Sequence, residues 1–399
     1  MKIFILVFAV IICLSSTSIG STVPTTGTWL GNQRALVLLL EWADKPSNHT
    51  RQVVDDTFFK LQAPSLRQYF VENSTGKFDI TGDVLEWKRS TLKWNAQRGC
   101  EPNFIAQEGW KQFSNLINMK DYDSNNDGKV DHLFIVHTGR IPHDRVGPSC
   151  MFGRLSQAEH TIVFQSEGVG SIGGALPIGF FLHEAGHELF GFPDLYNDHY
   201  HGRYGIGMWG MMGLGAWGTT NTIKQENLFR YPSHFEPYSK IQIGWVKPQI
   251  INKTQLGLKL RPVETSGDVI AIPLGYGTNY YLEYRSKQGF STDHRGHGLL
   301  IWNNYKIIQA DGRDDINSGT NLGHRPLPPI SENFGDESDP FPGALKITKF
   351  VDAKRGISVE NIVQYNDRIE FNVTITNAGM QQERVAPTTY KKRFNLNHL

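Results

Sequence analysis

The sequence predicts a mixed α/β (α+β) protein with two parts, one in which strands and helices alternate and one that is rich in short strands. Three observations support this prediction. Continuous apolar runs before residue 140 are typical of buried strands. Residues 177–190 have the apolar spacing of an amphipathic helix. After residue 250 the chain changes to short segments of alternating hydrophobicity.

The first part is expected to begin with a buried strand over residues 34–44, RALVLLLEWAD, which is apolar throughout and ends in a turn signal. A short helix capped near Ser65 should follow. The chain should then turn at residues 74–76 and continue as an alternating strand to Trp87. Three further elements are predicted: a helix over residues 101–120, a buried strand over 131–139 and an edge strand over 160–168.

The second part consists of segments that alternate apolar and polar residues, which is typical of strands with one buried face. These segments are LGLKLRPV, DVIAIPL, TNYYLEYRS, HGLLIWNN and RIEFNVTI. Because the pattern changes after KIQIGWVKP, a domain boundary is predicted near residue 250. The predicted domains therefore cover residues 21–250 and 251–375, and residues 376–399 form a polar tail.

Composition limits the classes of function. The chain has 399 residues, of which 20% are charged, and a formal net charge of +1. This balance gives no reason to expect binding to nucleic acid or to a membrane surface. We expect a monomer.

Residues 1–20 are predicted to be a secretory signal peptide. Lys2 supplies a short basic region, residues 3–13 form an apolar core too short to span a bilayer, and small residues permit cleavage near Ser18 or Gly20. An uncleaved anchor is the alternative. Since no later segment is apolar enough to cross a membrane, we expect a secreted, extracellular protein.

Secretion bears on the cysteines and on the glycosylation sequons. Cleavage removes Cys13, and the remaining Cys100 and Cys150 are expected to form a disulfide bond. Two free thiols, or a bond to another chain, are the alternatives. Four N-glycosylation sequons fit export, and they begin at Asn48, Asn73, Asn252 and Asn372.

The helix predicted over residues 177–190 carries the pattern H-E-x-x-H as His183, Glu184 and His187. Histidines four residues apart lie one turn apart, so both imidazoles can bind one metal ion. Glu184 is rotated by about 100° and lies beside the ion, where it can act as general base. The alternative is a surface helix with two solvated histidines. It is disfavoured by four apolar residues at the spacing of a buried face: Ile178, Leu182, Ala185 and Leu189.

A catalytic zinc ion needs a third protein ligand. In the extended pattern H-E-x-x-H-x-x-G-x-x-H/D that ligand lies six residues after the second histidine, where this chain has Pro193. The glycine and the acid follow one residue late, as Gly191 and Asp194. One more helical step or a wider turn can absorb the extra residue, so Asp194 is the predicted ligand. Its alternative role is to cap the turn, and the competing ligands are Asp198, His199 and His201.

The segment DYDSNNDGKVDHLFIV holds a second group of candidate ligands. Asp123, Asn125, Asp127 and Asp131 occupy positions one, three, five and nine of an EF-hand-like loop. Position twelve is Phe134 instead of glutamate, and a strand is predicted to follow. We therefore predict a calcium-binding loop that is not an EF-hand, with an ordinary Asn/Asp turn as the alternative.

Several motifs give the chain a resemblance to the immune inhibitor A type of secreted zinc metallopeptidases, which are metzincin-like. HEAGHELFGFPDLY resembles the family's H-E-x-G-H-x-L-G-L-P-D-x-Y, with one residue inserted. MWGMMGLGAWG resembles its segment with a methionine turn, and SLRQYFVENSTGKFDITGDVLEW, KIQIGWV and GDESDPFPG are similar to motifs before and after the site. One departure follows GLLIW, where Asn303, Asn304 and Tyr305 stand in place of the family's histidine and acid.

The resemblance implies a metzincin-like catalytic domain followed by a β-rich domain, endopeptidase activity on protein and peptide substrates, and structural calcium. The predicted function is thus a secreted zinc endopeptidase with Glu184 as general base and His183, His187 and Asp194 as zinc ligands. Two alternatives remain. One is a catalytically inactive secreted binding or adhesion protein on this scaffold. The other is a zinc hydrolase of another class whose third ligand is a glutamate farther along the chain.

Overall fold

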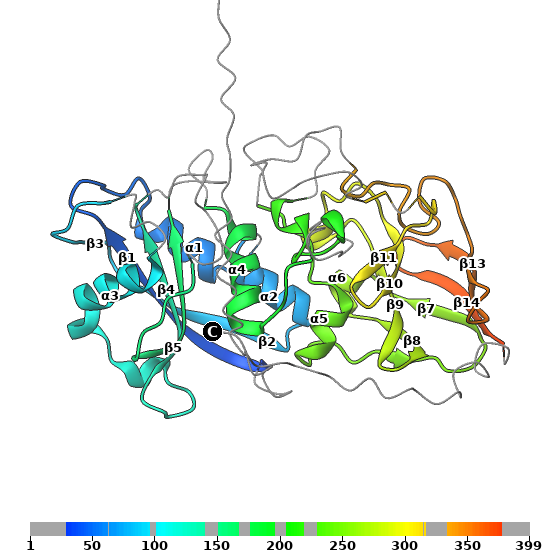
Figure 1. The fold of residues 1–399 in the computed structure, drawn as a ribbon, viewed down its shortest axis with the longest axis horizontal. Coiled ribbons are helices and arrows are strands. Elements are labelled where there is room, and N and C mark those ends of the chain that lie inside the picture. Colours follow the sequence, from blue (N-terminus) through cyan, green and yellow to red (C-terminus); the bar gives the residue numbers. More distant parts are fainter. Residues whose placement is uncertain are drawn as a thin grey trace, which may run out of the picture.

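The computed structural model describes residues 29–62, 64–95, 101–139, 151–166, 176–195, 205–218, 230–313, 315–316 and 333–376. Figure 1 shows one sheet with its helices at one end of the longest axis and two further sheets at the other end. The predicted fold class, a mixed α/β region followed by a β-rich region, is confirmed. The predicted signal peptide, both predicted disulfide cysteines and the competing ligands at 198, 199 and 201 lie outside the described residues.

The first part is built on a parallel sheet with the strand order β2-β1-β4-β5. These strands are β1 (Gly31–Glu41), β2 (Phe78–Val84), β4 (Val130–His137) and β5 (Ala158–Gln165), and the short β3 (Lys88–Arg89) pairs with the end of β1. All of these pairings are parallel. Parallel neighbours need crossover connections, which explains why helices alternate with strands along this part.

Both faces of the parallel sheet are buried. Ala35, Val37 and Leu39 join a core with α1 (Arg51–Phe59), α2 (Leu66–Ser74) and α4 (Ile178–Phe190). The alternate residues of β1, from Leu36 to Leu40, join a separate core with α3 (Pro102–Phe113). Figure 1 shows α3 apart from the other three helices. Burial on both faces is the reason why these strands are continuous apolar runs.

The second part contains two sheets. One has the order β11-β10-β9-β8-β6 and the other the order β12-β13-β14-β7. The bounds of the strands are β6 Gln249–Ile250, β7 Gln255–Leu260, β8 Ile270–Gly275, β9 Thr278–Arg285, β10 Gly298–Asn303, β11 Lys306–Ile308, β12 Phe350–Asp352, β13 Ile357–Gln364 and β14 Ile369–Ile375. Apart from the parallel pair β6 and β8, the pairings are antiparallel.

The first of these two sheets has an apolar core on each face. Ile270, Ile272 and Leu282 pack in a core with residues of the second sheet. Ala271 and Tyr281 belong instead to the large core that contains α2 and α4. The two parts of the chain therefore share a core, and the domain boundary near residue 250 stays a prediction.

Several short helical segments lie near the junction of the two parts or within them. They are α5 (Pro237–Gln242), α6 (Val263–Ser266) and the 3₁₀ segments η6 (Gly207–Trp209), η7 (Leu214–Trp217) and η9 (Gly289–Ser291). Two more 3₁₀ segments, η2 (Ser114–Leu116) and η3 (Met119–Tyr122), follow α3. Among the described residues, no helix has the length and apolar character needed to cross a bilayer.

Candidate metal centre

The helix α4 carries the H-E-x-x-H pattern and differs only slightly from its prediction. It begins at Ile178, after Pro177 at the N-cap, and it ends at Phe190. Gly191 then adopts a left-handed conformation with φ 68°, and its N–H donates to the carbonyl of His187 at 3.0 Å. This is how glycine commonly ends a helix, because a residue without Cβ adopts that conformation freely.

The extra residue before Gly191 does not separate the three predicted ligands. Nε2 of His183 lies 3.1 Å from Nε2 of His187, and Oδ1 of Asp194 lies 3.1 Å from the first nitrogen and 3.2 Å from the second. Among the described residues, these three form the one group of His, Cys, Asp or Glu side chains whose potential ligand atoms all lie within 4.8 Å of one another.

Backbone carbonyls fix the orientation of both imidazoles. Nδ1 of His183 lies 3.0 Å from the carbonyl oxygen of Met211, and Nδ1 of His187 lies 2.6 Å from that of Phe192. A carbonyl only accepts, so each Nδ1 must carry the proton. In the neutral rings both Nε2 atoms then present lone pairs toward each other and toward the carboxylate of Asp194. This arrangement requires a cation, either a proton or a metal ion.

The spacing of the three atoms fits zinc. Four ligands arranged tetrahedrally at the usual zinc–nitrogen and zinc–oxygen distances lie about 3.3–3.5 Å apart. The three separations here are 3.1–3.2 Å. Two imidazoles and one carboxylate also form an ordinary donor set for a catalytic zinc ion, and the carbonyl acceptors on Nδ1 are the usual outer partners.

In the chain without metal, the group attracts positive charge. Burial disfavours the imidazolium of His187, but the Asp194 carboxylate outweighs it and raises the pKa of His187 to about 9. Burial would raise the pKa of Asp194, yet both histidines hold it well below its usual value. The His183 side chain is only 6% exposed, whereas that of Asp194 is 44% exposed, so the site is open on the carboxylate side.

Glu184 lies beside this group and is not one of the three. It is 5% exposed, and its Oε2 is buried without a hydrogen-bond partner among the described residues. Burial raises the pKa of Glu184, while the two neighbouring histidines oppose this shift. A buried carboxylate with a raised pKa and a free oxygen beside a candidate metal centre is suited to accept a proton.

The segment around Met211 and Met212 forms the floor of the site. The carbonyl of Met212 accepts the N–H of Leu195 at 2.7 Å, next to Asp194. Gly186 on α4 faces Met212 so closely that an added Cβ would lie 2.7 Å from its sulfur atom. The floor segment therefore contacts His183 through Met211 and the residue after Asp194 through Met212. It comprises residues 208–218, MWGMMGLGAWG, the stretch that resembles the family's methionine-turn segment.

The predicted calcium loop is a tight turn between η3 and β4. Oδ1 and Oδ2 of Asp123 accept N–H groups of Asp127 and Gly128 at 3.0 and 2.8 Å, and Oδ1 of Asn125 accepts that of Asp127 at 2.9 Å. Oδ2 of Asp131 accepts from Ser124. Its Oδ1 is buried and has no hydrogen-bond partner among the described residues, which leaves one oxygen for a cation.

Glu159 on β5 was missed by the sequence reasoning. It lies 34 residues after Asn125, yet its Oε1 accepts from Nδ2 of Asn125 at 3.0 Å. Burial and the nearby carboxyls of Asp127 and Asp131 raise the pKa of Glu159. The loop has no glutamate at position twelve. The parallel pairing of β4 with β5 instead brings Glu159 to the loop from the neighbouring strand. Only the strand register, which the sequence does not state, could have identified it.

One predicted glycosylation site requires correction. Asn73 on α2 is 1% exposed, its Oδ1 accepts the N–H of Phe235 and its Nδ2 donates to the carbonyl of Tyr69. A glycan on Asn73 is incompatible with this packing, so we remove it from the candidate sites. Asn48 and Asn252 are exposed and Asn372 is half-buried. These three sites stay predictions.

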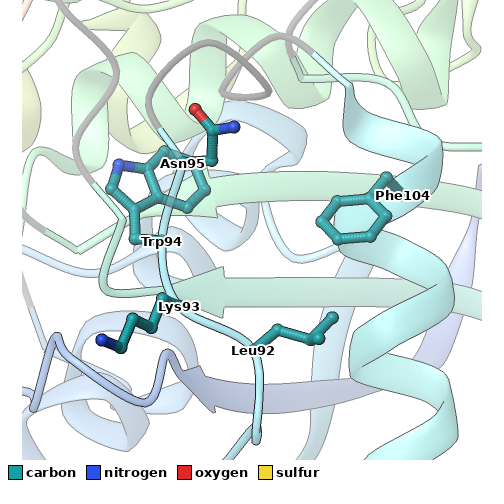
Figure 2. A pocket seen from close by; sticks show the side chains of 5 residues that line it. All are labelled: Leu92, Lys93, Trp94, Asn95 and Phe104. Carbon is teal, nitrogen blue, oxygen red and sulfur yellow. The ribbon is translucent and has the colours of Figure 1, made fainter.

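A separate pocket of about 230 Å³ lies on the first part of the chain. Its lining residues are Leu92, Lys93, Trp94, Asn95 and Phe104. Figure 2 shows the rings of Trp94 and Phe104 on opposite sides of the pocket, with Phe104 on a helix. None of the candidate ligands or Glu184 lines it, so this pocket is not the candidate metal centre.

The parallel sheet, the H-E-x-x-H helix and the methionine-containing floor together define a peptidase with a helix-borne candidate metal centre. Residues 156–246 match the family model described as immune inhibitor A peptidase M6, catalytic domain, and this match supports the resemblance of the chain to that family. The match includes α4, Asp194 and the floor segment. No curated protein matches the chain.

Proposed function

We propose that the protein is a secreted zinc-dependent endopeptidase. One observation carries this proposal: the Nε2 atoms of His183 and His187 and Oδ1 of Asp194 converge within 3.2 Å of one another, with both Nδ1 protons directed to backbone carbonyls. The three atoms are therefore already oriented to bind a cation. The match to the catalytic domain of a peptidase family supports cleavage of peptide bonds as its use.

The reaction assigns separate tasks to the ligands and to Glu184. His183, His187 and Asp194 would hold the zinc ion, which would supply a Lewis acid that lowers the pKa of water and polarises the scissile carbonyl. Glu184 takes up the proton of the attacking water on Oε2, which has no hydrogen-bond partner among the described residues, and later passes it to the leaving amine. In the chain without metal, burial raises the pKa of this carboxyl, which favours its taking up a proton.

We also propose that a calcium ion binds the loop of residues 123–131 and that Glu159 completes this site. The support is the buried Oδ1 of Asp131, which has no hydrogen-bond partner among the described residues, and the carboxylate of Glu159 on β5, which lies beside the loop. Calcium prefers several carboxylate, amide and carbonyl oxygens, which this loop offers. The role would be structural, because the loop positions the start of β4 and none of its residues is a candidate zinc ligand.

The departure from the family pattern after GLLIW has a structural explanation. Asn303 pairs with Lys306 at the end of β10, so Asn304 and Tyr305 form the two-residue turn of a hairpin. Asn304 has φ 49°, a conformation that asparagine tolerates better than most residues. This departure therefore does not favour the alternative of an inactive binding protein.

The proposal is tested with secreted wild-type protein and the variant Glu184→Ala, by measuring cleavage of casein and bound zinc on the same samples. We expect both proteins to bind one zinc ion and only the wild type to cleave. Loss of a general base typically lowers the rate about 10²- to 10⁴-fold.

Glu188→Ala is the matched control, because Glu188 lies on the same helix and pairs with Arg154 at 2.8 Å. It should retain both zinc and cleavage. A wild-type protein that binds zinc without cleaving any unstructured protein would support the inactive scaffold. A wild-type protein without zinc would reject the proposed site.

A further inference from the structure

We propose that Glu72 is a positioning residue for the metal centre and that it connects the β-rich part of the chain to the zinc ligand His183. The inference rests on the proposed function, since it concerns the same site. Glu72 lies on α2, outside the H-E-x-x-H pattern and outside the floor segment, and three successive contacts link it to His183.

The first contact orients the ligand. Nδ1 of His183 donates to the carbonyl of Met211 at 3.0 Å. The direction of this carbonyl fixes the rotation of the imidazole and therefore the position of Nε2. A shift of the backbone at Met211 would move the ligand atom directly.

The second contact fixes that backbone. The N–H of Met211 donates to the carbonyl of His234 at 3.0 Å, so the segment of residues 233–235 holds the same peptide group from its other side. The side chain of His234 is fully buried. The position of Met211 thus depends on what holds residues 233–235.

The helix α2 holds this segment with three side chains. Tyr69 donates its hydroxyl to the carbonyl of Ser233 at 2.7 Å, and Asn73 accepts the N–H of Phe235 at 2.9 Å. Between them, Oε1 of Glu72 lies 2.7 Å from Nε2 of His234. Glu72 differs from the other two because it contacts the side chain of His234 and not the backbone of the segment.

The same oxygen of Glu72 also contacts the β-rich part. It accepts the N–H of Phe290, in η9, at 2.9 Å. The carboxylate lies directly against Gly289, and an added Cβ there would collide with both of its oxygens. Gly289 also has φ 51°, so any other residue would be strained. Glu72 is therefore held between His234 on one side and η9 on the other.

Geometry rather than charge is the basis of this role. Glutamine in place of Glu72 would still accept from Phe290 and still bond to His234, whereas alanine would lose both contacts. Aspartate would be too short to make both at once. The side chain of Glu72 is only 9% exposed, so water cannot readily replace a lost partner.

The experiment compares Glu72→Ala, Glu72→Gln and Gly289→Ala with wild type. Each protein is loaded with cobalt(II), whose visible absorption reports ligand geometry, and its zinc dissociation constant is measured by competition with a chelator. We expect Glu72→Ala and Gly289→Ala to change the cobalt spectrum and to weaken zinc binding about tenfold, the lower end for outer partners of a metal ligand. Glu72→Gln should resemble wild type. Glu72→Asp takes the place of the alanine variant if the latter does not fold.

Glu108→Ala is the control for lost stability. Glu108 is another helical glutamate, 5% exposed, which bonds to Ser90 and Gln112 in the core around α3. It should lower the melting temperature and leave the cobalt spectrum unchanged. If Glu72→Ala behaves like this control, the positioning role is wrong. If wild type itself binds neither metal, the proposed function fails, and this inference fails with it.

Discussion

The chain offers two candidate metal sites that are organised in opposite ways. At the candidate zinc centre, the three potential ligand atoms lie within 3.2 Å of one another and their orientation is set by groups around them. In the loop of residues 123–131, the carboxylates accept N–H groups of the loop itself. The loop therefore has a stable shape of its own, and a single buried oxygen, Oδ1 of Asp131, has no hydrogen-bond partner among the described residues.

This difference bears on what each metal would do. The converging nitrogens and carboxylate need a cation, and a proton on His187 cannot replace the Lewis acid, so removal of metal from the candidate zinc centre should abolish its function. A turn closed by its own hydrogen bonds needs calcium less, and removal of calcium should only lower stability.

The largest effect is expected for His187→Ala, which removes a ligand. Zinc affinity should fall by more than the roughly 10- to 100-fold typical of outer partners, and cleavage should be lost with it. Competition with a chelator measures the affinity. The control is His160→Ala, a half-buried histidine on β5, which should keep wild-type zinc binding. Retention of tight binding in His187→Ala would contradict the assigned ligand set.

Asp194→Ala tests whether the displaced acid is the third ligand. We expect about a 100-fold loss of zinc affinity, somewhat less than for the histidine, because the more exposed position of Asp194 allows water to occupy it. Zinc content after dialysis measures this. His199→Ala and His201→Ala should retain zinc. If His199→Ala or His201→Ala loses zinc and Asp194→Ala keeps it, the assignment of Asp194 is wrong. If all three variants keep zinc, a glutamate elsewhere in the chain becomes the candidate for the third ligand.

The close packing of α4 on the floor segment predicts that Gly→Ala substitutions in two helices change the free energy of unfolding to different extents. At Gly186 an added Cβ would lie 2.7 Å from the sulfur of Met212, whereas at Gly109 on α3 its nearest neighbours would be Cδ1 and Cγ2 of Ile135, both at 3.2 Å. Gly186→Ala should lower the free energy of unfolding by about 2 kcal/mol despite better helix propensity. Gly109→Ala should stay within about 0.5 kcal/mol of wild type. Denaturant unfolding measures both, and equal effects would contradict the close packing.

The smallest effect is expected at the calcium loop. Calcium at ten times its dissociation constant should stabilise wild type by about 1.4 kcal/mol, and Asp131→Asn should lose most of this gain. Thermal unfolding with and without calcium measures it. Asp121→Asn, in η3 just before the loop, should keep the gain. If calcium changes the stability of neither protein, the loop is an ordinary turn.

The sequence predicts those parts of the fold that depend on local pattern. Apolar runs locate β1 and β4, and Ser65 and Gly191 mark the ends of α2 and α4 where capping chemistry requires them. The helix α1 was not predicted, although Thr50 caps it, because its nine residues are too few to show a clear helical period. The strands β11 and β12 have three residues each, too few to show a period.

In the candidate site too, the sequence predicts the residues that share one helix, and it does not predict contacts between distant segments. His183, Glu184 and His187 share one helix, so their spacing in sequence fixes their geometry. The return of Asp194 to the site depends on the left-handed turn at Gly191 and on the hydrogen bond from Leu195 to Met212, which a linear pattern does not contain. Glu159 and Glu72 act across long separations in the chain, and only the fold brings them to their partners.

The central claim is that the extra residue before Gly191 leaves Asp194 on the metal. X-ray absorption at the zinc edge of the wild-type protein tests this most directly, because it counts the imidazoles around the ion. For wild type we expect two imidazoles and additional oxygen ligands at about 2.0–2.2 Å from zinc. For Asp194→Ala we expect less bound zinc, and the zinc that remains should still have two imidazole ligands. Three imidazoles in wild type would show that another histidine takes the place of Asp194 and would contradict the proposed centre.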